Sequence, residues 1–322
     1  MKNKGFTLLE LLGVVIILGA LSLITFPIIL NQIKNAKQGI KDSTKALIID
    51  AAKDYYEDNS NNYDRVEGMT YCIDIETLTD ENYLNKNLKD ENLNNMDTSE
   101  KVKMFYHNDK FNYEVVDKCT NYTVTFDANG GTVGVESKKV TQDSVYGTLP
   151  TPTREGYTFM GWNGKNMLNV DEATNGCLID NGDGTYTMWY NNICRLSEKI
   201  NISIEANRTI VMSYDLIEYN GTYRNPLQIF GKYINNGYFY LDFIDNTETT
   251  KNVGKKYITQ DVSNLTIYQE GSQPVGTYTK FTNLQLEVGD TATEYEPYYV
   301  TSKTKVTRNY DHTLKAIWKE NE

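Results

Sequence analysis

The sequence offers few residues in the arrangements that catalysis usually requires. It has two histidines, His107 and His312, and it contains no Gly-x-Ser-x-Gly elbow, no His-Glu-x-x-His pair and no phosphate-binding glycine loop. Carboxylates are plentiful, with 43 Asp and Glu residues, so an acid pair for glycoside hydrolysis stays open as an alternative. We therefore expect a binding protein and not an enzyme.

One oxygen-rich stretch could bind a cation. Asp180 and Asp183 belong to the segment Asp-Asn-Gly-Asp-Gly-Thr, which has the oxygen density of a calcium loop. The segment lacks the downstream glutamate that completes an EF-hand, and a hairpin turn explains the same residue types. We favour the turn and keep structural calcium as the one cofactor under consideration.

Aromatic side chains are the better candidates for contact with a ligand. The chain has 25 Tyr against 10 Phe and 3 Trp, and tyrosine suits both half-buried strands and recognition surfaces. Sugar binding needs aromatic faces beside planar polar groups. Each candidate could instead pack in a core or on the face of a strand. The candidates are Trp189, Tyr190, Tyr223, Arg224, Tyr233 and Tyr238.

Four cysteines fall into two groups along the chain. Behind a membrane-targeting segment they are expected to form two disulfides, and four cysteines allow three connectivities. We favour Cys72 with Cys119 and Cys177 with Cys194, because each pair then stays inside one proposed domain. No pair has the spacing of a zinc knuckle.

The charge of the chain argues against nucleic acid as a partner. Its 43 acidic residues exceed its 32 basic ones, and the net charge of −11 repels phosphate. The length of 322 residues predicts two or three domains.

The elements that position these residues begin with a long N-terminal helix. The run Leu11–Leu30 carries no charge and is long enough to cross the roughly 30 Å hydrocarbon core of a membrane. It is too long for a secretory signal peptide, and an amphipathic pattern follows it. We predict one helix over residues 6–57, with 6–30 in the membrane. Placing the Glu10 carboxylate in the membrane costs free energy, so this residue needs a partner or a functional reason. Pro27 permits a bend in the helix.

The segment Lys-Gly-Phe-Thr-Leu-Leu-Glu that ends at Glu10 resembles the start of a type IV pilin or pseudopilin. The resemblance implies a leader over residues 1–5, cleavage by a prepilin peptidase between Gly5 and Phe6, and N-methylation of Phe6. It also implies that Glu10 pairs with the Phe6 amine of a neighbouring subunit and sets the axial register. Pro27 stands where the family tends to bend its helix. A plain signal anchor with its carboxylate near the headgroups is the alternative.

Residues 58–120 are expected to form a pilin head. The segment 75–84 predicts a short helix, and the alternating segments 101–106 and 110–116 predict a hairpin. Such a small sheet would pack on the C-terminal half of the long helix. His107 lies in the hairpin turn, where a solvated role is expected.

In residues 122–162, polar and apolar residues first alternate as in a strand, and an Asn-Gly turn follows. The segment ends in Gly-Tyr-Thr-Phe-Met-Gly-Trp at Trp162. It resembles the internalin-type B repeat, a small β-grasp-like module of bacterial surface proteins. The closing strand of that module does not follow Trp162, and residues 301–307 and 311–318 match it instead. His312 belongs to that strand and is expected to be structural. We therefore predict a split module of residues 121–163 plus 298–319, because a surface loop tolerates the insertion of a whole domain.

The insert, residues 164–297, contains short alternating strands at about ten-residue spacing, which predicts a β-sandwich. Its end, residues 281–298, resembles the last strand of galactose-binding-like jelly rolls in carbohydrate-binding modules and phage tail proteins. Jelly rolls of this kind often hold a structural calcium ion, which makes Glu172 and Glu287 further candidate ligands.

Together these segments predict an α+β multidomain protein: a long pilin helix with a small antiparallel sheet, then a β-grasp-like module interrupted by an all-β jelly-roll sandwich. We expect a minor type IV pilin-like subunit, at the tip or in a sparse position, of a Gram-positive bacterium. It would sit in the cell membrane before assembling with other pilin subunits, and its insert would bind a surface glycan or protein. The alternatives are a pseudopilin of a type II secretion or competence DNA-uptake machine, and a membrane-anchored glycan-active enzyme.

Overall fold

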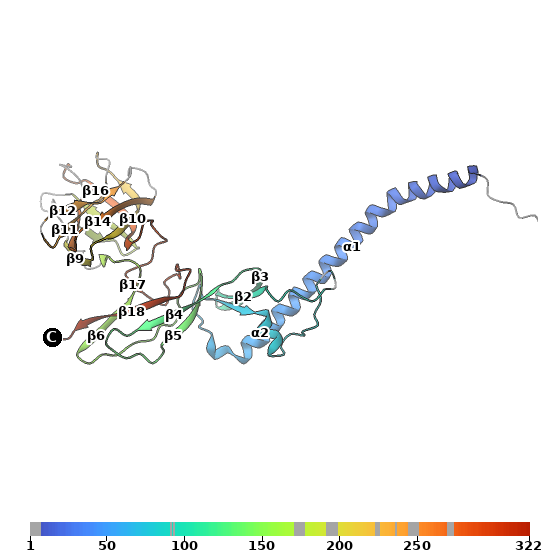
Figure 1. The fold of residues 1–322 in the computed structure, drawn as a ribbon, viewed down its shortest axis with the longest axis horizontal. Helices are drawn as coiled ribbons and strands as arrows, with labels where there is room; N and C mark the ends of the chain where they lie inside the picture. The colour runs from blue at the N-terminus through green and yellow to red at the C-terminus, as the bar shows by residue number, and fades with distance from the viewer. Residues whose placement is uncertain are drawn as a thin grey trace, which may run out of the picture. The chain divides into compact units, whose positions relative to one another are not determined.

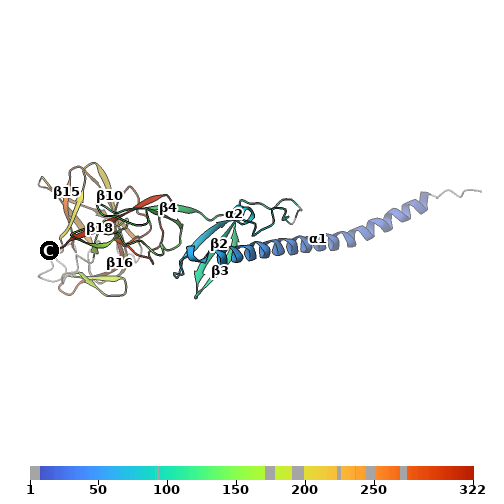
Figure 2. The same ribbon diagram turned by 90° about the horizontal axis from the view of Figure 1, so that it is seen from below.

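A computed structural model describes residues 8–90, 92, 94–170, 178–190, 199–222, 226–235, 237–243, 251–268 and 274–322. The chain divides into two compact units. The first comprises residues 1–65 and 70–120, and the second comprises residues 66–69 and 121–322. Over the described residues a long helix precedes four β-sheets (Figures 1 and 2), which confirms the predicted α+β class.

Helix α1 (Leu8–Asp58) is a single helix of 51 residues that continues through Pro27. At 1.5 Å per residue it is roughly 75 Å long. Its first half is apolar yet is not covered by the other residues that the structure describes, as Leu9 (78% exposed) and Leu23 (79% exposed) illustrate. Within the described residues, α1 is the one helix long and apolar enough to cross a membrane.

The last turns of α1 form the core of the first unit. Ile48, Ala51 and Ala52 are buried there against the apolar faces of a short helix and a small sheet. Figure 1 shows these elements beside the C-terminal part of α1. The sheet is antiparallel in the order β1-β2-β3. The elements are η1 (Ser60–Asn62), β1 (Thr70–Asp74), α2 (Ile75–Asp80), β2 (Lys101–His107) and β3 (Lys110–Val116).

A disulfide ties the end of the first unit to its sheet. Cys72 and Cys119, the first of the favoured pairs, are bonded with their Cα atoms 5.6 Å apart and 47 residues apart in sequence. By loop-closure entropy a bridge of this span stabilises the fold by about 4 kcal/mol. The second favoured pair, Cys177 with Cys194, lies outside the described residues.

In the second unit, the C-terminal strand lies at the centre of a five-stranded sheet. The strand order is β17-β6-β18-β4-β5, and β18 pairs in parallel with β4 and antiparallel with β6 (Figure 1). Residues from both ends of the second unit thus share one core, which includes Trp162 and Leu314. The strands are β4 (Asn121–Asp127), β5 (Ser137–Thr141), β6 (Tyr157–Asn163), β17 (Tyr299–Val300) and β18 (His312–Glu320).

The chain leaves this sheet and returns to it at adjacent points. Tyr299 pairs with Asn163 across β17 and β6, and the Gly164 amide donates to the Tyr298 carbonyl over 2.7 Å. A Cβ atom on Gly164 would lie 1.7 Å from the Pro297 carbonyl oxygen, so only glycine fits at the exit. Everything between these points can therefore fold as a separate layer pair without disturbing the five-stranded sheet.

The intervening residues form a β-sandwich. A six-stranded sheet in the order β13-β14-β10-β16-β8-β7 and a four-stranded sheet in the order β12-β11-β15-β9 share one apolar core, and every described pairing is antiparallel. The strands are β7 (Leu178–Asp180), β8 (Thr185–Trp189), β9 (Lys199–Ile204), β10 (Arg208–Tyr219), β11 (Gln228–Tyr233), β12 (Tyr238–Tyr240), β13 (Asp242–Phe243), β14 (Lys251–Ile258), β15 (Val262–Tyr268) and β16 (Tyr278–Val288).

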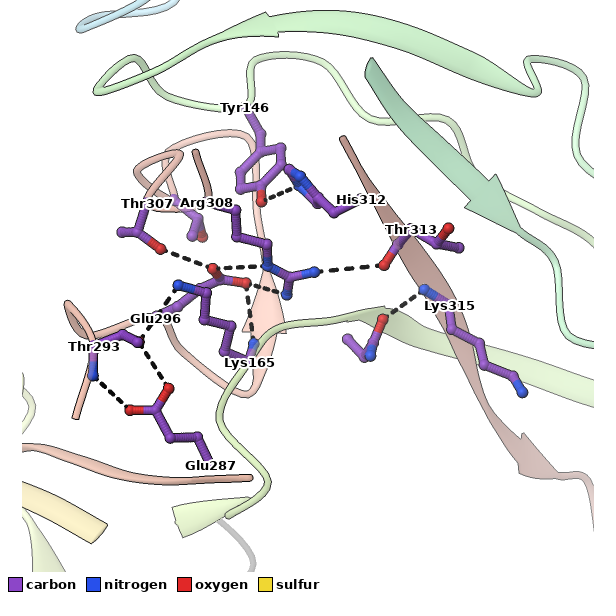
Figure 3. A network of polar contacts seen from close by, with 12 residues as sticks. Tyr146, Lys165, Glu287, Thr293, Glu296, Thr307, Arg308, His312, Thr313 and Lys315 are labelled. Carbon is purple, nitrogen blue, oxygen red and sulfur yellow. Dashed lines mark hydrogen bonds and ion pairs between the residues drawn. The ribbon is translucent and has the colours of Figure 1, made fainter. Parts of the chain in front are cut away.

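A buried ion pair stands where the sandwich chain rejoins the five-stranded sheet. Glu296 is fully buried and the Arg308 side chain is 7% exposed, and their Oε1 and Nη2 atoms are 2.5 Å apart. The carboxylate also accepts hydrogen bonds from the Arg308 Nε, the Thr307 hydroxyl and the Lys165 backbone amide (Figure 3). Both charges are thus compensated inside the protein, which burial of charge requires.

His312 lies beside this pair and is held in one neutral tautomer. Its Nδ1 lies 2.9 Å from the Tyr310 carbonyl oxygen, which can only accept, so Nδ1 carries the proton. Its Nε2 then accepts from the Tyr146 hydroxyl over 2.8 Å. Burial lowers the pKa of His312 below its ordinary value of 6.5, and the nearby Arg308 guanidinium acts in the same direction.

Replacing Glu296 by Gln should destabilise the second unit by about 3 kcal/mol or more, because Arg308 would be left buried without its counter-charge. Tryptophan fluorescence during denaturant unfolding reports on this unit alone, since Trp162, Trp189 and Trp318 all lie within it. Glu294→Gln is the matched control. Its carboxylate pairs with Lys305 at the surface and contributes less than about 1 kcal/mol. Equal losses in the two variants would contradict the structural role of the buried pair.

The second unit should lose stability as the pH falls from 7 toward 5, partly through His312. Its pKa is lowered in the fold, so the stability is present above the unfolded pKa near 6.5 and declines below it as the unfolded chain binds a proton first. His312→Gln should flatten this dependence, measured as the unfolding midpoint at each pH. His107→Gln, at the exposed end of β2, is the control and should keep the wild-type slope.

Candidate functional site

The outer half of α1 is the first candidate functional surface. Glu10 lies in its first turn, while Gly5 and Phe6 lie outside the described residues. The predicted amphipathic stripe is covered only at its end, because Ile33 and Ile40 remain 47% and 39% exposed whereas Ile48 is buried. An apolar surface of this length on one helix requires lipid or another protein to cover it.

The predicted ligand-contact residues do not come together in one place. Trp189 is 37% exposed and lies against Tyr278, with ring centroids 5.0 Å apart, in the six-stranded sheet. Tyr190 is buried, and Tyr233 packs against the sandwich core. Tyr238 is exposed on the other, four-stranded sheet. Tyr223 and Arg224 lie outside the described residues.

Around Tyr238 the structure assembles three aromatic rings on one face. The Phe230 ring lies 5.8 Å from the Tyr238 ring and 6.0 Å from the Tyr240 ring, measured between centroids. Tyr238 is 61% exposed and Tyr240 is 53% exposed. We call Phe230, Tyr238 and Tyr240 the aromatic platform. Exposed rings side by side on a strand face are the kind of surface that stacks on apolar faces of a ligand.

Strand alternation explains why these rings face outward. On β12 the middle residue, Phe239, is 4% exposed and belongs to the core, so its two neighbours point the other way. Phe239 pairs with Gly231 on β11, and a Cβ atom there would lie 2.1 Å from the Phe239 ring. Gly231 therefore makes room for the inward ring. Lys232 pairs with Tyr238 and adds a cation beside the platform.

Sequence reasoning found Tyr238 but missed its two partners. The alternation Tyr-Phe-Tyr in β12 was a sufficient signal for Tyr240, because residues two apart share a face. Phe230 could not be found in this way, since its position beside Tyr238 depends on the register between β11 and β12.

The predicted calcium ligands are engaged in hydrogen bonds within the protein. In the β7–β8 turn, Asp180 accepts from the Gly182 amide and Asp183 accepts from the Thr185 amide and hydroxyl. The Thr185 hydrogen bonds lower the pKa of Asp183. Glu287 is 7% exposed and accepts from the Thr293 amide over 2.8 Å.

The contacts of Asp180 and Asp183 are those of a turn, and the contact of Glu287 is a buried hydrogen bond to the Thr293 amide. Glu172 lies outside the described residues. Among the residues that are described, no group of three or more His, Cys, Asp or Glu side chains is placed to hold a metal ion. Calcium binding therefore stays a prediction.

Two protein families match parts of the chain. The prokaryotic N-terminal methylation motif matches residues 1–26, which lead into α1. The Listeria-Bacteroides repeat domain matches residues 122–179, which include β4, β5 and β6. The central strand β18 lies outside the matched residues, although it pairs with two of these strands. Together the two matches account for less than half of the chain.

Solved structures were also compared with the whole chain. A mutant of a family 29 carbohydrate binding module is 11% identical, with a TM-score of 0.26, over 53% of this chain and 92% of the module. A mutant of the module CBM29-2 complexed with mannohexaose is 11% identical, with a TM-score of 0.25 and the same coverage. Such low TM-scores carry no argument about fold or ligand. No curated protein matches the chain. The chain thus carries a type IV pilin-like methylation motif and a Listeria-Bacteroides repeat domain, and its β-sandwich is shown by the pairing of its own strands.

Proposed function

We propose that the protein is a minor subunit of a bacterial type IV pilin-like filament whose sandwich serves in adhesion. The observation that carries the proposal is that the methylation motif leads directly into a helix whose apolar first half none of the described residues covers. Membrane lipid covers such a surface before assembly, and the helices of neighbouring subunits cover it in a filament.

In this proposal a prepilin peptidase cleaves between Gly5 and Phe6, and the new Phe6 amine is methylated. Glu10 of one subunit then pairs with that amine on its neighbour. Removing a carboxylate from its counter-charge in an apolar medium is costly, so the pair selects one axial register between helices. The exposed residues Ile33 and Ile40 extend the apolar contact toward the head.

The bulk of the second unit favours a sparse or terminal position in the filament. This unit contains about two thirds of the chain, namely residues 121–322 with 66–69, and so large a head is difficult to repeat side by side along a shaft. A terminal position would also present the aromatic platform to a surface. We infer that its ligand is an uncharged saccharide that stacks on Tyr238 and Tyr240.

Glu10→Ala should leave the protein processed and membrane-bound but poorly incorporated into filaments, by about tenfold or more. Immunoblots would measure the size shift on processing, the membrane fraction and the content of sheared filaments. Ser22→Ala is a matched control on the same exposed helix, because its hydroxyl bonds only to the Leu18 carbonyl of its own helix. Wild-type incorporation of Glu10→Ala would contradict the pairing.

The double variant Tyr238→Ala and Tyr240→Ala should bind neutral oligosaccharides on a glycan array roughly 30-fold more weakly, since each ring contributes about 1 kcal/mol. Tyr257→Ala is the control, because Tyr257 is equally exposed at 54% but lies on β14 of the other sheet. If the double variant still binds saccharides, the platform is not the saccharide site. If the wild-type protein binds only protein ligands, the ligand of the platform is a protein and not a saccharide.

A further inference from the structure

The second unit contains a cleft lined jointly by the five-stranded sheet and the sandwich. Its volume is about 640 Å³, within the range of about 300–1,000 Å³ that is typical of small-ligand sites. One wall includes Arg154 and Trp318 from the five-stranded sheet and its loops, and the other includes Ile202 of β9. The aromatic platform lies on β11 and β12, at the opposite edge of the sheet that contains β9, so the cleft is a different site.

The charge of the cleft is opposite to that of the chain. Three cationic residues, Arg154, Lys165 and Lys315, contribute to its lining, and none of the described lining residues is Asp or Glu, although the chain as a whole has a net charge of −11. Like charges in one concavity, here those of Arg154 and Lys315, repel each other and attract an anion. A ligand with a negative group would relieve this repulsion.

Two of these cations lack a carboxylate partner among the described residues. Arg154 lies over the Tyr157 ring at 3.8 Å from its centroid and donates only to the Asn129 carbonyl, over 3.3 Å. Lys315 is exposed, and Figure 3 shows its side chain directed away from Glu296. The Arg154 guanidinium and the Lys315 ammonium therefore both have N–H groups that could donate hydrogen bonds to an anion.

Lys165 is the third cation, and it is partly buried. Its ammonium lies 3.4 Å from the Thr293 hydroxyl. Burial lowers its pKa, although Glu296 opposes that effect. Glu287 and Glu294 act in the same direction as Glu296, so carboxylates of the protein compensate this charge and the cleft relies on the other two cations.

Aromatic and amide groups complete the lining. The Trp318 indole is fixed because its Nε1 donates to the Ala128 carbonyl over 3.0 Å, and its ring meets the Phe159 ring edge to face at 5.6 Å. Asn129 and Asn163 also line the cleft. The Asn129 amide nitrogen donates to the Ala316 carbonyl and the Asn163 oxygen accepts from the Lys315 amide, so both side chains are held in place. Oriented indole and amide groups are the means by which proteins bind sugar rings.

We propose that this cleft binds an anionic saccharide, a sugar that carries a carboxylate or a phosphate group, with Arg154 and Lys315 on the anion and Trp318 beside the sugar ring. The proposal does not depend on filament assembly or on the aromatic platform. An acidic peptide shares the charge but not the ring, and the aromatic and amide lining favours the sugar.

The test is calorimetric titration of the full chain in detergent micelles. The probes are trigalacturonate with its methyl ester, and mannose 6-phosphate with mannose, so that each charged sugar has a neutral twin. We expect at least one charged sugar to bind about tenfold or more tightly than its twin, because a charge-assisted hydrogen bond is lost in the neutral form. Which charged sugar binds identifies the anionic group. The affinity should also fall as salt is added.

The variant Arg154→Gln with Lys315→Gln should lose about tenfold or more in affinity for the charged sugar. Lys139→Gln is the matched control, because Lys139 is exposed on β5 of the same sheet but does not line the cleft. The tryptophan unfolding transition verifies that each variant is folded. Tyr238→Ala with Tyr240→Ala should leave binding of the charged sugar unchanged, so failure of the cleft and failure of the platform are distinguishable.

Three results would overturn the proposal. The first is that neither charged sugar binds more tightly than its neutral twin, and the second is an affinity that the double cation variant does not change. The third is binding of a polyglutamate peptide as tight as that of either sugar, which would make the cleft a site for acidic protein segments.

Discussion

The second unit depends on the buried pair between Glu296 and Arg308. A sheet that is interrupted by a whole sandwich must receive the returning chain at the place where the chain left, and this pair stands at the return. Glu296 ends the sandwich segment, Arg308 leads into β18, and the same carboxylate accepts the Lys165 amide at the exit. The exit at Lys165 and the return at Glu296, which are 131 residues apart in sequence, thus meet on one carboxylate. A charge buried at 0% exposure is tolerated because Lys165 and Arg308 both supply donors to it.

This junction does not constrain the outward-facing residues of either sheet of the sandwich. Their shared core is formed by inward residues such as Phe239 and Leu265, so the outward residues are not constrained by packing. The aromatic platform uses that freedom at one edge of the four-stranded sheet. At the other edge, β9 meets the five-stranded sheet across the cationic cleft. A chain of strongly acidic composition can therefore offer both a neutral aromatic face and a site for anions, because the charge of a site is a local property.

The first unit poses a different physical demand. Its helix buries Ile48, Ala51 and Ala52 in its own head, but the apolar side chains of the first half of the helix stay exposed among the residues that the structure describes. The free energy of covering them must come from lipid or from other subunits. The apolar surface of helix α1 therefore needs a partner outside the chain. The apolar residues of the second unit, by contrast, pack against one another.

Much of the architecture was accessible from local patterns. The long apolar run predicts α1, alternating residues predict most strands, and the turn at Asn108 and Asp109 has the positive φ angles of a tight hairpin. The return of the chain at β18 was also expected, because residues 311–318 matched a strand that the module lacked. The apolar and aromatic run over residues 237–243 of the insert shows where local patterns fail, because its pattern alone indicates one strand. It divides into β12 and β13, which belong to different sheets, since Leu241 turns into the core between them.

The sequence by itself determined the elements whose signal is local: a membrane-length helix with a carboxylate in its first turn, and strands whose alternation marks an inner and an outer face. Only the tertiary structure decided which residues become neighbours. Phe230 joins Tyr238 through strand register, and Arg154 joins Lys315 through the packing of a loop against β18. The four predicted contact residues that the structure describes did not form one site, because they are divided between the core and the two sheets of the sandwich. Periodicity encodes which face a residue takes, but register and layer packing decide which residues share that face.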